Sequence, residues 1–181
     1  ATAVQYKLLM LALSGVDKVA TLPKPAVWLL FSFLSLRSRV VSLLDNSRPN
    51  REAQKGKATP VDVKRPSWTP PGIAFPFIWL TITALRATAA QMAYAGSLRN
   101  PALDALVLHL CIGDTWNCIT NVERRLGVSA VGCFAVWGSV FRAVKAFGAS
   151  AAPKAAYVLA PSLAWISIAC VLTASIWNLN G

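Results

Sequence analysis

Four apolar stretches follow one another from residue 72 onward, and they constrain the fold more than any other feature of the sequence. They cover residues 72–95, 101–122, 127–147 and 153–177. Each is long enough for a membrane-spanning helix, which needs about 20 consecutive apolar residues. Proline stands near the start of three of them, where its missing N–H costs a helix nothing. The pattern therefore predicts four spans in this part of the chain.

The connections between these spans are very short: residues 96–100, 123–126 and 148–152. Connections of this length make consecutive helices antiparallel neighbours in one bundle. A further apolar stretch, residues 27–44, adds a fifth span, although Arg37 and Arg39 interrupt it. We expect these two arginines to extend to the membrane interface, as long cationic side chains do. The predicted fold is all-α, a bundle of five transmembrane helices.

The segments outside the spans are amphipathic or polar. Residues 1–25 mix leucine and valine with charged residues until Pro23 and Pro25 stop the helix, which favours an additional helix in the membrane interface. Residues 45–67 form a basic linker that contains proline and cannot lie in hydrocarbon. The sequence thus predicts an N-terminal extension, residues 1–25, and one membrane domain, residues 26–181, which includes the linker.

The composition supports a multi-pass integral membrane protein. Apolar residues make up 55% of the chain and charged residues only 14%, well below the roughly 25% typical of soluble domains. The net charge of +11 would suggest nucleic acid in another context, but the basic residues lie mostly between the apolar stretches, as in membrane-flanking loops. We therefore expect lipid and no nucleic acid as partners. Because the sequence begins at Ala1 rather than Met, we expect that an upstream segment has been removed.

Catalytic and metal-binding patterns are sparse in this sequence. The four cysteines lie inside apolar stretches without a C-x-x-C pair, which favours buried small hydrophobic side chains and no structural metal: Cys111, Cys118, Cys133 and Cys170. One histidine and seven carboxylates offer little material for acid–base or nucleophilic chemistry. We predict that the chain is not an enzyme.

Ionisable residues inside the predicted spans are the first candidates for a site, because exposing them to lipid is costly. At 1.5 Å of rise per residue, Arg86 lies about 21 Å beyond Gly72, and His109 lies about 12 Å beyond Pro101 on the antiparallel neighbour. In a hydrocarbon core about 30 Å thick, these two depths nearly coincide. Asp114 is about 10 Å away in depth and is a poorer partner for Arg86. The spacing predicts a pair between Arg86 and His109.

His109 has two interpretations that the sequence leaves open. A neutral imidazole can be the axial ligand of the metal in haem or chlorophyll. Alternatively, the ring is hydrogen-bonded within the bundle. Near the start of the same span, Asp104 is expected to cap the helix, where a carboxylate favours the positive end of the helix dipole.

The run Lys64-Arg65-Pro66-Ser67-Trp68-Thr69-Pro70-Pro71, followed by Phe75 and Trp79, resembles the signature that opens the second helix of the TspO/MBR family. This family comprises the tryptophan-rich sensory proteins and the translocator proteins, also called peripheral benzodiazepine receptors. Further matches follow in the right order: Trp116, Gly127, Pro153, residues 160–165, Leu172, Trp177 and Asn180. The resemblance covers residues 66–180 and implies a five-helix bundle.

The resemblance also implies a ligand and a cavity. Family members bind tetrapyrroles such as protoporphyrin among their helices, and many form homodimers. The matching ligand-binding positions in this chain are Trp68, Pro70, Pro71, Trp79, Trp116, Pro161, Trp165, Ala169 and Leu172. Indole rings offer flat faces that suit a planar apolar ligand, although tryptophan in membrane helices also serves as a packing residue or interface anchor.

Four positions depart from the family pattern, each with a smaller side chain than the family has. Thr83 replaces a tyrosine, Gly113 an asparagine, Ser162 a tyrosine and Thr173 an asparagine. The lost groups would supply the oriented hydrogen bonds of an apolar pocket, so their loss argues for a changed ligand or none. The sterol motif of animal members also lacks its tyrosine and basic residue after Leu172, so sterol transport is not predicted.

Two hypotheses follow. The first is an accessory subunit of an organellar membrane complex, photosynthetic in the plastid thylakoid or respiratory in the mitochondrion. Such a subunit would contact other subunits and lipid, and would bind a porphyrin, haem, chlorophyll or carotenoid. The alternative is a stand-alone TspO-type protein, monomeric or homodimeric, that binds or transports porphyrin or another small apolar ligand.

Overall fold

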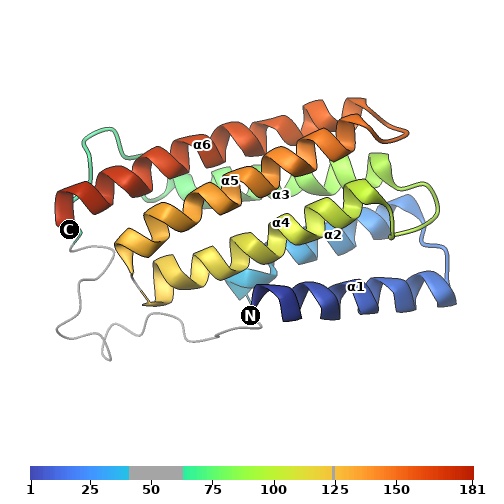
Figure 1. Ribbon diagram of the computed structural model, residues 1–181. Helices are drawn as coiled ribbons and strands as arrows, with labels where there is room; N and C mark the ends of the chain where they lie inside the picture. The colour runs from blue at the N-terminus through green and yellow to red at the C-terminus, as the bar shows by residue number, and fades with distance from the viewer. Residues whose placement is uncertain (41–62, 124) are drawn as a thin grey trace.

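The computed structural model describes residues 1–40, 63–123 and 125–181, and in these residues the regular structure is entirely helical (Figure 1). The helices are α1 (Thr2–Val19), α2 (Lys24–Val40), α3 (Ala74–Ala93), α4 (Pro101–Cys118), α5 (Leu126–Gly148) and α6 (Lys154–Asn180). A π-helical turn, Ile119–Glu123, continues α4. The all-α prediction is confirmed for this part of the chain.

Local signals set the helix boundaries where the sequence predicted breaks. The segment that holds Pro23 separates α1 from α2, and α4 begins with Pro101 at its first position. The N-cap of α4 is Asn100, whose side chain accepts hydrogen bonds from the backbone N–H groups of Ala102 and Leu103. Asp104 is therefore not the N-cap, although its carboxylate does lie in the first turn, near the positive end of the helix dipole, as predicted. Asp104 lies in the first turn, because an asparagine already occupies the capping position.

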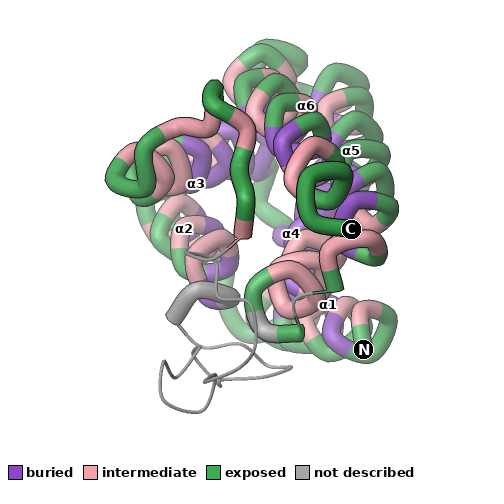
Figure 2. Tube along the Cα trace, turned by 90° about the vertical axis from the view of Figure 1, so that its left-hand side faces the viewer, coloured by how far each residue is buried: buried purple, intermediate pink, exposed green. Residues whose placement is uncertain are grey.

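The helices α2 to α6 form a ring with α1 outside it. In order around the ring, α2 packs against α3, α3 against α6, α6 against α5, and α5 against α4, which returns to α2. Figure 2 shows this arrangement nearly end-on, with buried residues on the helix faces that meet. Helix α1 packs along α4 through Gln5, Met10 and Leu13. It therefore runs beside the bundle helices, and its location in a membrane interface stays a prediction.

The interior is filled by two clusters of apolar side chains. The larger one includes the fully buried Phe31, Leu106 and Phe147. The smaller one joins α5 to α6 through Cys133, Val136, Val140, Ile166 and Cys170. Three cysteines are buried as predicted, namely Cys111, Cys133 and Cys170, whereas Cys118 is half-buried.

The outer surface also carries many large apolar side chains. Examples are Phe77 on α3, Val131 and Phe134 on α5, and Tyr157 and Val171 on α6, each more than half exposed. Many exposed large apolar side chains are typical of a surface that contacts lipid or another protein.

Two of the described helices, α5 and α6, are long and apolar enough to cross a membrane. Helix α2 is described for only 17 residues. The count of five spans stays a prediction. Residues 41–44 of the first predicted span, most of the basic linker and the side chain of Arg39 lie outside the described residues.

Candidate functional site

A cavity of about 320 Å³ lies between α3, the end of α4 and α6. Five of the nine predicted ligand-binding residues line it: Trp79, Trp116, Trp165, Ala169 and Leu172. The volume lies at the lower end of the range of roughly 300–1,000 Å³ that is usual for small-molecule sites. Most of its wall is aromatic or aliphatic, which suits an apolar ligand. We call this space the tryptophan cavity.

Three indole rings of the tryptophan cavity are held by defined contacts. The ring of Trp165 meets those of Phe75 and Trp79 edge to face, with centroids 6.1 and 6.4 Å apart. The Nε1–H of Trp116 donates to the backbone oxygen of Ser129 at 2.9 Å. By contrast, the buried Nε1 of Trp165 has no hydrogen-bond partner among the described residues. A buried donor left without an acceptor is costly.

The other four predicted ligand-binding residues do not line the tryptophan cavity. Trp68 is about half exposed, at 48%, and Pro71 beside it is exposed, while Pro70 is half-buried. Pro161 lies inside α6, one turn before Trp165, and is exposed. Their ligand-binding role stays a prediction.

Several polar lining residues were missed from the sequence. Asn117 stands beside Trp116, and Thr120 and Asn121 follow on the π-helical turn. The i, i+4 spacing of Trp116 and Thr120 was the signal that both share one helix face. Arg65 and Thr69, from the segment before α3, complete the lining on another side.

The segment before α3 is fastened to the end of α6. The backbone N–H of Lys64 donates to Asn180 Oδ1 at 2.9 Å, and Asn180 Nδ2 donates to the backbone oxygen of Lys64 at 2.8 Å. Because Arg65 and Thr69 follow directly, this pair of hydrogen bonds fixes one wall of the tryptophan cavity.

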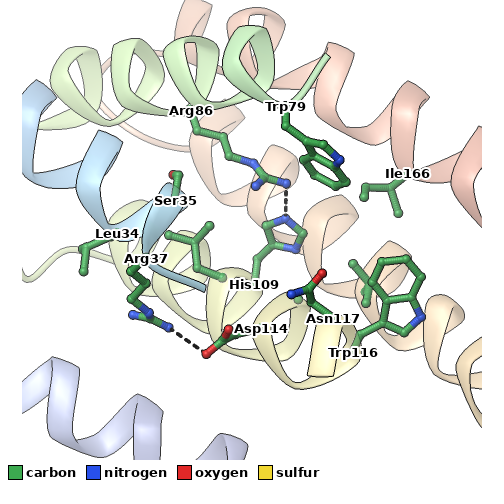
Figure 3. Close-up of a pocket in the computed structure, with 13 residues that line it drawn as sticks. Leu34, Ser35, Arg37, Trp79, Arg86, His109, Asp114, Trp116, Asn117 and Ile166 are labelled. Carbon is green, nitrogen blue, oxygen red and sulfur yellow. Dashed lines mark hydrogen bonds and ion pairs between the residues drawn. The ribbon is translucent and has the colours of Figure 1, made fainter. Parts of the chain in front are cut away.

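A second, polar pocket of about 40 Å³ adjoins the tryptophan cavity (Figure 3). Trp79, Trp116 and Asn117 line both spaces. The three intramembrane polar residues predicted from the sequence all line the second one: Arg86, His109 and Asp114. We call it the polar pocket.

The predicted pair between Arg86 and His109 is confirmed. Arg86 Nη2 lies 2.7 Å from His109 Nε2, and His109 Nδ1 lies 2.9 Å from Ser139 Oγ. A guanidinium only donates, so Nε2 accepts and the proton is on Nδ1. The hydroxyl of Ser139 in turn donates to the backbone oxygen of Val136 at 2.7 Å. The imidazole is therefore neutral, with both nitrogens engaged.

This arrangement favours the hydrogen-bonded interpretation of His109. Axial ligation of haem or chlorophyll would require one of its two hydrogen bonds to break. In residues 1–40, 63–123 and 125–181, no group of three or more metal-ligating side chains is present. The metal-binding role of His109 stays a prediction.

Arg37 does not extend to an interface, and that prediction is wrong for this residue. Its side chain is buried, and its Nη2 lies 4.0 Å from Asp114 Oδ2 and 3.8 Å from Cys111 Sγ. Gln5 of α1 donates to the same Asp114 oxygen. The carboxylate at this depth attracts Arg37 inward, and α1 covers the pair. Asp114 is thus the partner of Arg37 rather than of Arg86.

The comparisons with known proteins agree with this architecture. The sequence model of the TspO/MBR family matches residues 40–178. A protein named CrtK from Rhodobacter capsulatus is 26% identical over 122 residues, which are 65% of this chain and 76% of that protein. The family match includes every residue that lines the tryptophan cavity and confirms the resemblance seen in the sequence. Since it extends over more than half of the residues, the chain belongs to the TspO/MBR family of membrane proteins.

Proposed function

We propose that this protein binds a flat, largely apolar ligand of the tetrapyrrole class in the tryptophan cavity. The observation that carries the proposal is the unpartnered, buried indole N–H of Trp165 in the wall of a cavity of about 320 Å³. A planar ring would contact the indole faces, and a polar atom at its edge would accept the hydrogen bond. The TspO/MBR family is associated with porphyrin binding, which supports this ligand class.

We infer a binding role without catalysis, within an organellar membrane complex. Two features support an accessory subunit. The first is α1, which lies before the family match and packs onto α4, and the second is the apolar outer surface of α5 and α6. Haem, chlorophyll or a carotenoid would each present the flat or extended apolar surface that the tryptophan cavity suits.

The alternative is a stand-alone ligand-binding or transport protein, monomeric or homodimeric. The retained cavity favours it, because a purely structural subunit has no need of an open space lined by three indoles. Both functions share the ligand and differ in the partners.

Ligand binding is tested by titrating the purified protein in lipid nanodiscs with protoporphyrin IX and following tryptophan fluorescence. We expect saturable quenching, and we expect Trp165→Phe to weaken binding because it removes the indole N–H. Trp137→Phe is the matched control, because Trp137 lies on the exposed side of α5, stacks on Phe141 and donates to Ser167 of α6. Equal affinity of both variants and the wild type would show that the assigned cavity is wrong.

The subunit role is tested by native electrophoresis of mildly solubilised membranes that contain the protein. An accessory subunit migrates with a large complex, and pigment analysis of that band identifies its chromophores. Migration of all the protein as a free monomer or dimer would refute recruitment and favour the stand-alone function.

A further inference from the structure

Basic side chains gather at the end of the bundle where α5 meets α6. Figure 1 shows the turn between α5 and α6 at the same end as the α1–α2 and α3–α4 connections. Arg142 and Lys145 lie near the C-terminal end of α5, and Lys154 is the first residue of α6. All three side chains are exposed. Basic residues at the end of an apolar helix attract the anionic headgroups of lipids.

The acidic residues at this end of the bundle lie on other helices. Residues 126–181, which include α5 and α6, contain no aspartate or glutamate. Asp17 of α1 accepts hydrogen bonds from the backbone N–H of Leu98 and the hydroxyl of Ser97. Asp104 of α4 forms an ion pair with Arg99 at 3.2 Å. An anion that approaches the α5–α6 end therefore meets helices whose ionisable side chains are all basic.

An aromatic pair lies next to these cations, toward the middle of α5. The rings of Trp137 and Phe141, one helical turn apart, stack with centroids 5.4 Å apart and an interplanar angle of 5°. The Nζ of Lys145, a further turn along, lies 5.9 Å from the centroid of the Phe141 ring. A cation over an aromatic face is held there by electrostatic attraction. The pair thus keeps the ammonium group of Lys145 at the border between the charged and the apolar parts of the helix.

Beyond the aromatic pair, the exposed face of α5 is apolar. Phe141 is 43% exposed, Phe134 68% and Val131 66%. At about 1.5 Å of rise per residue, the stripe from Val131 to Phe141 is about 15 Å long. Since the hydrocarbon core of a bilayer is about 30 Å thick, the stripe matches one leaflet. Its length therefore suits an acyl chain whose headgroup lies at the cations.

We propose that this face of α5 binds an anionic phospholipid, with Arg142 and Lys145 at the phosphate and an acyl chain along Phe141, Phe134 and Val131. The phosphate oxygens accept charge-assisted hydrogen bonds from the guanidinium and ammonium groups. A zwitterionic lipid has the same phosphate but adds a cation that the two basic side chains repel. The inference goes beyond the proposed function and does not depend on the tryptophan cavity. It leaves the outer surface of α6 available to a neighbouring subunit.

The test compares dioleoyl phosphatidylglycerol with dioleoyl phosphatidylcholine, which have the same acyl chains and differ in net charge. The purified protein in detergent is titrated with each lipid, and native mass spectrometry measures the fraction of protein that carries it. The wild type should bind phosphatidylglycerol at least about fivefold more tightly, because each basic residue near a lipid surface contributes roughly a factor of five. Arg142→Gln/Lys145→Gln should lose most of this preference and retain its affinity for phosphatidylcholine.

Lys18→Gln/Lys24→Gln is the matched control for charge. It removes two exposed cations from the same end of the bundle, on α1 and α2, and should keep the preference. A second pair of variants tests the apolar stripe. Phe134→Gln should weaken the binding of both lipids alike, whereas Tyr157→Gln, at a position of α6 that is 80% exposed, should not.

Four results would overturn the proposal. The first is equal affinity of the wild type for the two lipids. The second is an equal loss of preference in the α1–α2 control, because net charge alone would then explain it. The third is displacement of phosphatidylglycerol by glycerol 3-phosphate, which has no acyl chain and would show a site for soluble phosphate. In the fourth, the α5 variant keeps its lipid preference but no longer migrates with a large complex in native electrophoresis, so that the face binds protein instead.

Discussion

Replacing Asp114 by leucine leaves the guanidinium of Arg37 buried without its carboxylate. The two groups are 4.0 Å apart, which corresponds to about 4 kcal/mol of attraction at an effective dielectric constant of 20. The variant also removes the acceptor of the Gln5 amide. Breaking one partner of a buried pair costs about 3–5 kcal/mol, and we expect a loss of that size in the free energy of unfolding. The double variant Arg37→Leu/Asp114→Leu removes both charges and should regain most of it.

The measurement is reversible unfolding in mixed micelles with increasing dodecyl sulfate, followed by tryptophan fluorescence. The matched control is Asp104→Leu, because Asp104 forms an exposed ion pair with Arg99 at 3.2 Å. Exposed pairs contribute at most about 1 kcal/mol. If Asp114→Leu costs no more than this control, or if the double variant is as unstable as the single one, the two charges do not stabilise each other and the reasoning is wrong.

Three further predictions test other parts of the fold. Gly127→Ala should lower the free energy of unfolding by about 1–2 kcal/mol, and with it the Tm, because the added Cβ would lie 3.1 Å from Trp177 Nε1. Scanning calorimetry of the solubilised protein measures the Tm, and an unchanged value contradicts the close approach. Asn100→Ala removes the two cap hydrogen bonds of α4 and should cost about 0.5–2 kcal/mol, measured in the same way, with recovery in Asn100→Ser. The thiols of Cys133 and Cys170 are 2.7 Å apart, so the two-electron oxidant diamide should link α5 to α6, detected by mass spectrometry of protease fragments; a link that survives Cys133→Ser argues against this register.

Some contacts of the polar pocket could be predicted from the sequence, because they depend on residue spacing along single helices. The pair between Arg86 and His109 followed from the rise per residue in two antiparallel neighbours joined by a short turn. The burial of Arg37 did not follow, because its partner Asp114 lies on a helix that is distant in sequence and is covered by Gln5 of α1. Only the tertiary arrangement brings these three elements to one depth.

For the tryptophan cavity too, some lining residues were predicted correctly from the sequence and others were not. Resemblance identified Trp79, Trp116 and Trp165, and the helix faces place them around one space. It identified Trp68 and Pro161 equally strongly, yet both are exposed, because a motif preserves residue types without stating which way each one faces. The polar lining of the π-helical turn had one sequence signal, the i, i+4 spacing of Trp116 and Thr120, and the sequence analysis missed it.

The clasp between Lys64 and Asn180 bears on the speed of ligand exchange. Its two hydrogen bonds join the segment that carries Arg65 and Thr69 to the end of α6, so a ligand that entered past this segment would have to displace it first. Neither Lys64 nor Asn180 lines the tryptophan cavity, so loosening the clasp should accelerate ligand arrival and departure alike. Residence time would then depend on this contact at the surface of the bundle, whereas equilibrium affinity would depend on the indoles further inside.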